Sequence, residues 1–237
     1  MKGIVLLPLL LGMSSSYAGV MGPISEQPVA GFSPYIGLEG SYTWNQIGST
    51  QLNTFSTSSS DGPWGGRLSI GATHPFSERF SFSAELGGGY YGSTDQVYPS
   101  HLATLDQTID GYDLLGGAIY QFNQVSVFGQ LGVMMQNTRV KASVNNTIVP
   151  GGIASGVQTN IFNYTQALPE IRVGGMYSLS NNWGLSLAYM HVFGSVRESS
   201  YVISLTPSSS VQQGQSILQN PTLDSVMLGV RYMFSNT

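Results

Sequence analysis

The stretch VMLGVRYMF, residues Val226–Phe234, places an arginine inside an otherwise apolar run close to the end of the chain. Its apolar side chains alternate, with Val226, Leu228, Val230, Tyr232 and Phe234 on one face. Ser225, Gly229 and Arg231 share the other face. A period of two residues predicts a β-strand. Which of its two faces meets water decides what kind of β-protein this is.

The same alternation recurs along the chain, so the strand at 225–234 is the last of a series. The other runs cover residues 35–44, 64–73, 80–91, 111–122, 125–136, 168–179 and 183–193. Tight connections lie around Ser77, around Asn123 and at 180–182, whereas 45–63, 93–110, 137–166 and 195–223 are long. Because short and long connections alternate, the pattern predicts an eight-stranded up-and-down meander with all long loops at one end.

The apolar face of these strands is aliphatic in the middle and aromatic at both ends. At the long-loop end stand Trp44, Trp64, Tyr90, Tyr112 and Phe193. At the tight-turn end stand Phe80, Tyr120, Phe122, Tyr177, Trp183, Tyr232 and Phe234. Two aromatic girdles around an aliphatic band are typical of outer-membrane barrels, whose strands of about 10 residues cross the hydrocarbon layer.

The opposite face carries nearly all the charges of the strands. They are Glu39, Arg67, Glu85, Asp113, Glu170, Arg172 and Arg231. A soluble sandwich would bury its apolar face and leave these charges in water, whereas here the apolar face has the features of a lipid-facing surface. The sequence therefore predicts an all-β fold, an eight-stranded antiparallel up-and-down transmembrane β-barrel with its charges inside.

Four acids and three arginines on the inner face predict an ion-pair network that plugs the lumen, since an unpaired buried charge is costly. Eight strands enclose a space that side chains can fill. Arg231 is expected to pair with at least one of the four inner acids, Glu39, Glu85, Asp113 and Glu170. Glu39 is favoured, because the first and last strands must pair to close the barrel. The alternative is that the charges line a small water-filled vestibule.

Composition and the N-terminus add the compartment. Only 8% of residues are charged, and there is no Cys, so disulfides, Cys-zinc sites and thiol catalysis are excluded. A basic start, an apolar run and Ser16-Tyr17-Ala18 predict a signal peptide over 1–18. Residues 19–33 are then a leader, 34–234 the barrel and 235–237 a tail. No basic patch points to nucleic acid, and no metal or cofactor is expected.

Two stretches resemble known outer-membrane proteins. Residues Gly229–Phe234, with Gly229, Tyr232 and Phe234 in the matching positions, resemble the C-terminal insertion signal that the barrel-assembly machinery reads. Residues Leu168–Gly194 are similar to the small barrels of the OmpA, OmpX and opacity type, without the peptidoglycan-binding domain of OmpA. The resemblance implies a Gram-negative outer membrane, contact with lipid and lipopolysaccharide, and roles in envelope integrity, adhesion or host contact.

Some outer-membrane barrels are enzymes, so the surroundings of the three histidines are compared with the catalytic patterns of those enzymes. His191 lacks the His-x-Ser pattern of lipid A deacylases, and Asp95, His101, Asp106 and Asp110 form only a weak match to the outer-membrane protease type. His74 lies at a tight turn. The sequence therefore favours a non-enzymatic surface protein whose Ser-, Thr-, Asn- and Gln-rich loops contact a host or matrix ligand. A narrow porin or small-solute channel is the alternative, and an outer-membrane enzyme is less favoured.

Overall fold

The computed structural model describes residues 31–46, 58–97, 103–145, 157–204 and 211–234. The predicted signal peptide (1–18), the predicted tail (235–237) and all but the last residues of the predicted leader (19–33) lie outside the described residues. Within the described ranges, no helix is long and apolar enough to cross a membrane.

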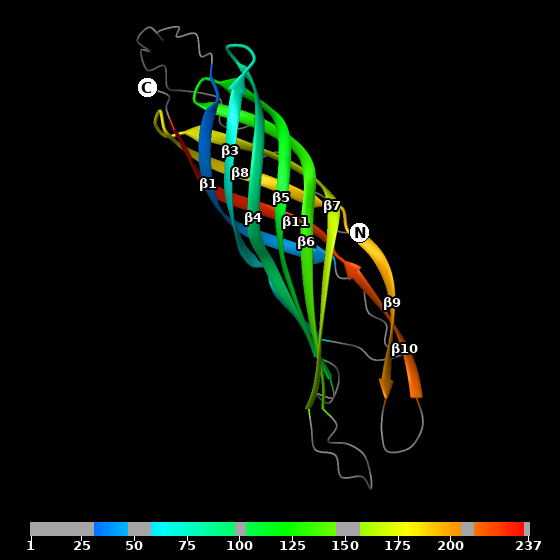
Figure 1. Cartoon of the computed structure of the whole chain (residues 1–237). Helices are drawn as coiled ribbons and strands as arrows, with labels where there is room; N and C mark the ends of the chain where they lie inside the picture. The colour runs from blue at the N-terminus through cyan, green and yellow to red at the C-terminus, as the bar shows by residue number, and fades with distance from the viewer. Residues whose placement is uncertain (1–30, 47–57, 98–102, 146–156, 205–210, 235–237) are drawn as a thin grey trace, which may run out of the picture. The chain divides into compact units, whose positions relative to one another are not determined.

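Eight antiparallel strands close into a barrel (Figure 1). They are β1 (Ser33–Gln46), β3 (Trp64–Pro75), β4 (Phe80–Val97), β5 (Ala103–Phe122), β6 (Val125–Asn145), β7 (Val157–Ser178), β8 (Trp183–Val192) and β11 (Thr222–Met233). Hydrogen bonding runs β4-β3-β1-β11-β8-β7-β6-β5, and β4 also pairs with β5. The predicted eight-stranded up-and-down barrel is therefore confirmed.

The first and last strands pair with each other, as the sequence predicted. β1 and β11 run antiparallel from Tyr35 opposite Met233 to Gln46 opposite Thr222. This pairing gives β11 a neighbour on both sides, because β8 lies along its other edge. A closed barrel leaves no unpaired strand edge, which is the condition for β-structure in a lipid layer.

The three tight turns lie where the sequence placed them. Phe76 and Leu179 each donate a backbone hydrogen bond of 2.8 Å across the turn, to Phe80 and Trp183 respectively. Between β5 and β6 the turn uses Asn123, whose φ is 52°. Asn accepts this left-handed conformation more readily than most residues do. Short turns keep consecutive strands adjacent and fix their register.

Two of the four long connections, predicted as loops, consist mostly of residues that continue the barrel strands on either side. β4, β5, β6 and β7 contain 18 to 22 residues, whereas β8, β3, β11 and β1 contain 10 to 14. Residues 93–97 belong to β4 and 103–110 to β5, and these two strands pair there. In the same way most of 137–166 belongs to β6 and β7, which pair with each other (Figure 1). The apolar alternation marks only the lipid-crossing part of a strand, whereas the hydrogen-bond ladder continues with polar side chains.

The other two long connections also contain short strands. β2 (Ser58–Gly62) pairs with the end of β4, and β9 (Ser195–Ser204) forms a two-stranded sheet with β10 (Val211–Asn220). These strands extend the polypeptide at the long-loop end of the barrel and add nothing to its closure. No apolar alternation marks these strands, so the predicted loops at 45–63 and 195–223 did not include them, and the prediction of a loop at 195–223 is wrong for most of its residues.

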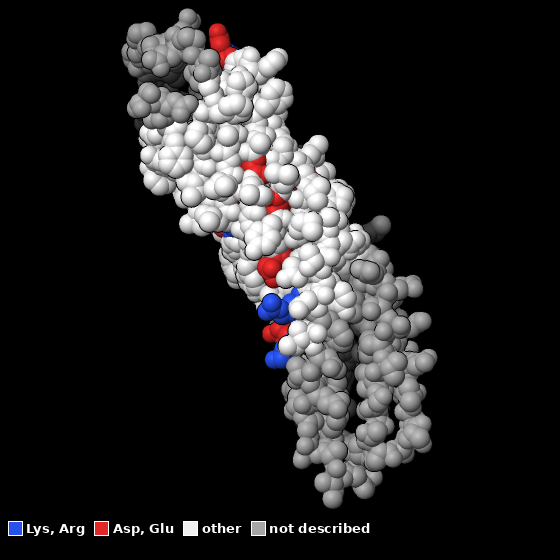
Figure 2. Space-filling view, viewed as in Figure 1, with Lys and Arg blue, Asp and Glu red and all other residues white. Residues whose placement is uncertain are grey.

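The outer wall of the barrel is largely apolar. Leu38, Leu114, Leu131 and Leu228 are 58–65% exposed. Most charged side chains on the described face in Figure 2 lie in one narrow row, and the rest of that face is uncharged. Aromatic rings within the predicted girdle at the tight-turn end contact one another. The ring centroids of Trp183 and Tyr232, for example, are 5.0 Å apart. Such a continuous apolar wall is stable in contact with lipid and costly in contact with water.

Candidate functional site in the barrel lumen

All seven charged residues predicted for the inner face are buried inside the barrel. Their exposed fractions range from 0% for Arg172 to 5% for Arg231. They come from β1 (Glu39), β3 (Arg67), β4 (Glu85), β5 (Asp113), β7 (Glu170 and Arg172) and β11 (Arg231). Strand parity alone brings them together, since each alternates with an outward-facing neighbour along its own strand.

Arg67 lies at the centre of the charged network. Its Nε donates to Asp113 at 2.8 Å, and its Nη2 donates to the other oxygen of the same carboxylate. Its Nη1 donates to Glu39 at 3.0 Å and to Glu85 at 2.6 Å. One fully buried guanidinium therefore holds three carboxylates from three different strands. The fork of five donors is what suits an arginine, and no lysine, to this role.

Arg172 and Arg231 complete the network from the other side of the lumen. Arg172 donates to Glu85 at 2.7 Å and also pairs with Glu39. Arg231 donates to Glu85 at 3.1 Å, so Glu85 accepts hydrogen bonds from all three arginines. Arg172 on β7 and Arg231 on β11 have their partners on β1 and β4, so these pairs join strands that are not neighbours in the sheet.

The preference for Glu39 as the partner of Arg231 was wrong. Arg231 is opposite Gly37. Glu39 is opposite Gly229, which lies two residues before Arg231 on β11. The carboxylate of Glu39 is already held by Arg67, which is directly opposite it on β3, and by Arg172. Arg231 therefore reaches across the lumen to Glu85 instead.

Two tyrosines and a phenylalanine belong to the network and were missed as site residues. The hydroxyl of Tyr35 donates to Glu85 at 2.7 Å, and that of Tyr91 donates to Asp113 at 3.3 Å. The guanidinium of Arg231 lies 4.1 Å from the ring centre of Tyr35 and 5.9 Å from that of Phe128. The parity of Tyr35 with Glu39 was a usable signal. Tyr91 was hidden beside Tyr90, at a bulge where the register shifts.

Glu170 is the exception among the predicted residues. It is buried at 1% exposure, but neither of its carboxylate oxygens accepts a hydrogen bond within the described part of the chain. Asp113, Arg67 and Arg172 are its charged neighbours in the lumen. The structure therefore brings six of the seven residues into direct contact and places the seventh beside them.

Glycines make the space that the network occupies. A Cβ added at Gly87 would clash with the guanidinium of Arg67, and one added at Gly229 would clash with the side chain of Glu39. Gly229 was singled out as part of the insertion signal. Its place in the lumen gives it a second role, in admitting Glu39.

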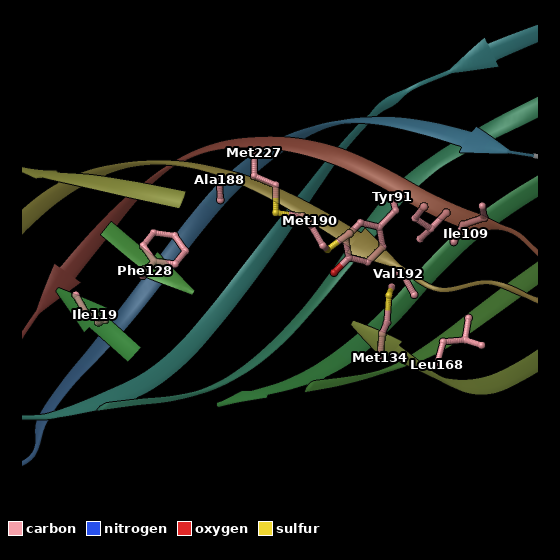
Figure 3. Packing of buried hydrophobic residues seen from close by; sticks show 11 residues of the cluster. Tyr91, Ile109, Ile119, Phe128, Met134, Leu168, Ala188, Met190, Val192 and Met227 are labelled. Carbon is pink, nitrogen blue, oxygen red and sulfur yellow. The ribbon is translucent and has the colours of Figure 1, made fainter. Parts of the chain in front are cut away.

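Apolar and uncharged polar side chains occupy the rest of the lumen, and Figure 3 shows the apolar ones. Tyr91, Met134, Met190 and Val192 converge in one group, and Ile119 and Phe128 lie away from it toward the tight turns. All of these residues are at most 8% exposed. The sequence did not predict this plug of apolar residues, because apolar side chains were assigned to the lipid face. Charge pairs and apolar packing together close the lumen.

The candidate catalytic residues are dispersed. His74 packs against Phe32 at 5.0 Å, and His101 lies outside the described residues. Asp95 and Asp106 are opposite each other on β4 and β5, while Asp110 bonds to the amide of Asn137 at 3.2 Å. In the described ranges, no group of three or more His, Cys, Asp or Glu residues is placed to hold a metal ion.

The contacts of Arg231 lead to a double-mutant prediction. Arg231→Met and Glu85→Gln should show a coupling free energy of roughly 0.5–3 kcal/mol in urea unfolding, because each removes the other's partner. The cycle of Arg231→Met with Glu39→Gln should show a smaller coupling, since these two side chains form no ion pair with each other. A coupling to Glu39 as large as that to Glu85 would contradict the observed pairing.

No protein-family model matches the chain, and no curated protein matches its sequence. Solved structures of outer-membrane barrels do match. Ail, the attachment invasion locus protein of Yersinia pestis, is 16% identical, with 86% of this chain and 97% of that chain covered and a TM-score of 0.43. OprG of Pseudomonas aeruginosa is 12% identical, with 87% and 97% covered and a TM-score of 0.47. Neisserial surface protein A is 18% identical, with 86% and 99% covered and a TM-score of 0.35.

At these identities and TM-scores the matches support no conclusion about this chain. The strand order and register establish the fold independently of any relative. The chain is a closed eight-stranded antiparallel barrel, which is the architecture of the small outer-membrane barrels that its sequence resembles.

Proposed function

We propose that the protein is a non-enzymatic surface protein of the bacterial outer membrane. The barrel anchors it in lipid and lipopolysaccharide after export and insertion by the barrel-assembly machinery. The filled lumen is the observation that carries the proposal. Arg67, Glu85, Asp113 and Arg172 are at most 1% exposed and hold one another by ion pairs. A barrel closed in this way suits anchoring and display better than passage of solutes.

The long-loop end supports a role in contact outside the cell. β4, β5, β6 and β7 continue well past Tyr90 and Tyr112, which belong to the girdle at that end. Both termini of the barrel lie at the other, tight-turn end, which is periplasmic if export follows the predicted signal peptide. The extended strands and the connections between them are then the part that reaches envelope neighbours or a host or matrix ligand.

Conductance separates this proposal from the narrow-channel alternative. Purified protein reconstituted into planar lipid bilayers should give no stepwise conductance, because paired charges and apolar side chains occupy the lumen. Circular dichroism of the same preparation verifies that the barrel is folded. Reproducible steps from folded wild-type protein would overturn the plugged barrel and favour a channel.

Surface contact is tested on intact cells. Replacing residues 146–156, between β6 and β7, with a short Gly-Ser linker should reduce the attachment of cells to immobilised matrix proteins. The matched control is Asn123→Gly with Gln124→Ser, which changes the tight turn at the opposite end of the barrel. Equal attachment of both strains and of wild-type cells would remove adhesion from the proposal and leave a structural role in the envelope.

A further inference from the structure

A polar cluster on the outer wall of the barrel has no role in the anchoring function. It consists of Asp224, His191 and Tyr189, with Trp44 beside it. We infer that this cluster is a binding site for the ammonium group of a lipid headgroup. The inference goes beyond the proposed function, because it names a specific lipid contact of the barrel wall.

Strand register places the cluster. Asp224 on β11 is opposite Trp44 on β1 and opposite His191 on β8, so the three form one row across three adjacent strands. Tyr189 lies two residues below His191 and also faces outward. Trp44 and Tyr189 are 49% and 42% exposed, while the residues that alternate with them, such as Thr43 and Met190, are buried in the lumen. The row therefore lies on the wall that faces lipid.

The row lies at the level of the aromatic girdle at the long-loop end of the barrel. Trp44 was predicted as a girdle residue. The ring of Tyr42 lies between two girdle tryptophans, with centroid distances of 5.0 Å to Trp44 and 5.1 Å to Trp64. Aromatic girdles mark the level of the lipid headgroups. A carboxylate at this level meets headgroups, and not bulk water or hydrocarbon.

Asp224 is held so that one of its oxygens stays available. Nδ1 of His191 lies 2.7 Å from Oδ1, and the hydroxyl of Tyr189 donates to that same oxygen. No described side chain donates to Oδ2, and no described Lys or Arg forms an ion pair with Asp224. A carboxylate that is partly withdrawn from water gains most from a cationic partner.

Carboxylate and aromatic faces together select an ammonium group. A cation near Oδ2 of Asp224 would also lie close to the face or edge of Trp44, because directly opposed side chains on one sheet face have Cβ atoms about 4.5–5.5 Å apart. Aromatic faces attract ammonium groups, Trp most strongly. A phosphate would instead meet the negative charge of Asp224. The expected ligand is therefore an ethanolamine-type headgroup.

The test uses a variant in which Trp64→Phe and Trp183→Phe leave Trp44 as the reporter. In a neutral detergent, short-chain phosphatidylethanolamine should change its fluorescence saturably, at about tenfold lower concentration than short-chain phosphatidylglycerol does. Asp224→Asn, which keeps the shape of the side chain, should abolish that preference. The matched control is Asp110→Asn on β5, an outward carboxylate bonded to the amide of Asn137, and it should retain the preference.

Each other outcome overturns the inference. Equal responses to the two lipids in the Trp44 reporter would leave the cluster as interfacial hydrogen bonding only, and this comparison needs no substitution at Asp224. A preference for phosphatidylglycerol would indicate a phosphate site on His191. Saturation by free ethanolamine at the same concentration as by the lipid would indicate a soluble amine. Loss of the preference in Asp110→Asn would show a general charge effect.

Discussion

Replacing Arg67 with methionine should lower the free energy of unfolding of the barrel by roughly 3–5 kcal/mol, the range for breaking a buried ion pair by removing one partner. The Arg67 side chain is 0% exposed and holds Glu39, Glu85 and Asp113. Without it, Asp113 keeps only the hydroxyl of Tyr91 as a donor from the described side chains. Urea unfolding in detergent micelles, followed by tryptophan fluorescence, measures the loss.

Arg79→Met is the matched control, because Arg79 is exposed in the tight turn between β3 and β4. It should change the free energy of unfolding by less than about 0.5 kcal/mol. Adding Asp113→Asn to Arg67→Met should recover part of the loss, since it removes one of the stranded charges. Equal effects of the two arginine substitutions would show that the lumen charges are solvated and that the network does not hold the barrel.

Leu187→Arg should destabilise the lipid-inserted barrel by about 2–4 kcal/mol, the cost of an arginine on the lipid face near the bilayer midplane. Leu187 is 53% exposed and lies between Leu228 of β11 and Gly175 of β7. Along β8, Leu187 is four residues from Trp183, which belongs to the girdle at the tight-turn end, and two residues from Tyr189 on the long-loop side. The measurement is urea titration of folding into phosphatidylcholine vesicles.

Leu179→Arg is the control for this charge, because Leu179 is 60% exposed in the tight turn before β8 and outside the aliphatic band. It should be tolerated within about 0.5 kcal/mol. Ser186, the inward-facing neighbour of Leu187, is unsuitable as a control position. It faces a filled lumen at 3% exposure, so an arginine there would overpack the core. Equal tolerance at Leu187 and Leu179 would contradict a lipid-facing wall.

Strand parity was enough to predict the barrel and the charged residues of its lumen. Alternation assigned Glu39, Arg67, Glu85, Asp113 and Arg172 to the inside, and the described structure places them there. The rule works because a one-residue shift would exchange the lipid face and the lumen face of a whole strand. The tight turns were predictable for the same reason, since they separate successive alternating runs.

Pairing within the lumen was beyond the sequence. Arg231 reaches Glu85 on a strand that is not its neighbour, because the choice depends on which carboxylates other arginines already hold. The extended strands β4 to β7 were also missed, since polar ladders carry no apolar period. Met134 and Phe128 were not predicted to lie in the lumen, because the prediction assigned apolar residues to the lipid face and these two apolar residues face inward.

Spin labels along β8 test the central claim, a lipid-facing wall around a plugged lumen, most directly. The chain contains no Cys, so single cysteines can be introduced from Leu185→Cys to Met190→Cys and labelled one at a time in bilayers. Labels at 185, 187 and 189 should be accessible to oxygen, which dissolves in lipid, and labels at 186, 188 and 190 should be shielded from oxygen and from a water-soluble nickel complex. Access of the nickel complex to 186 and 188, or loss of the alternation in oxygen access, would contradict the account.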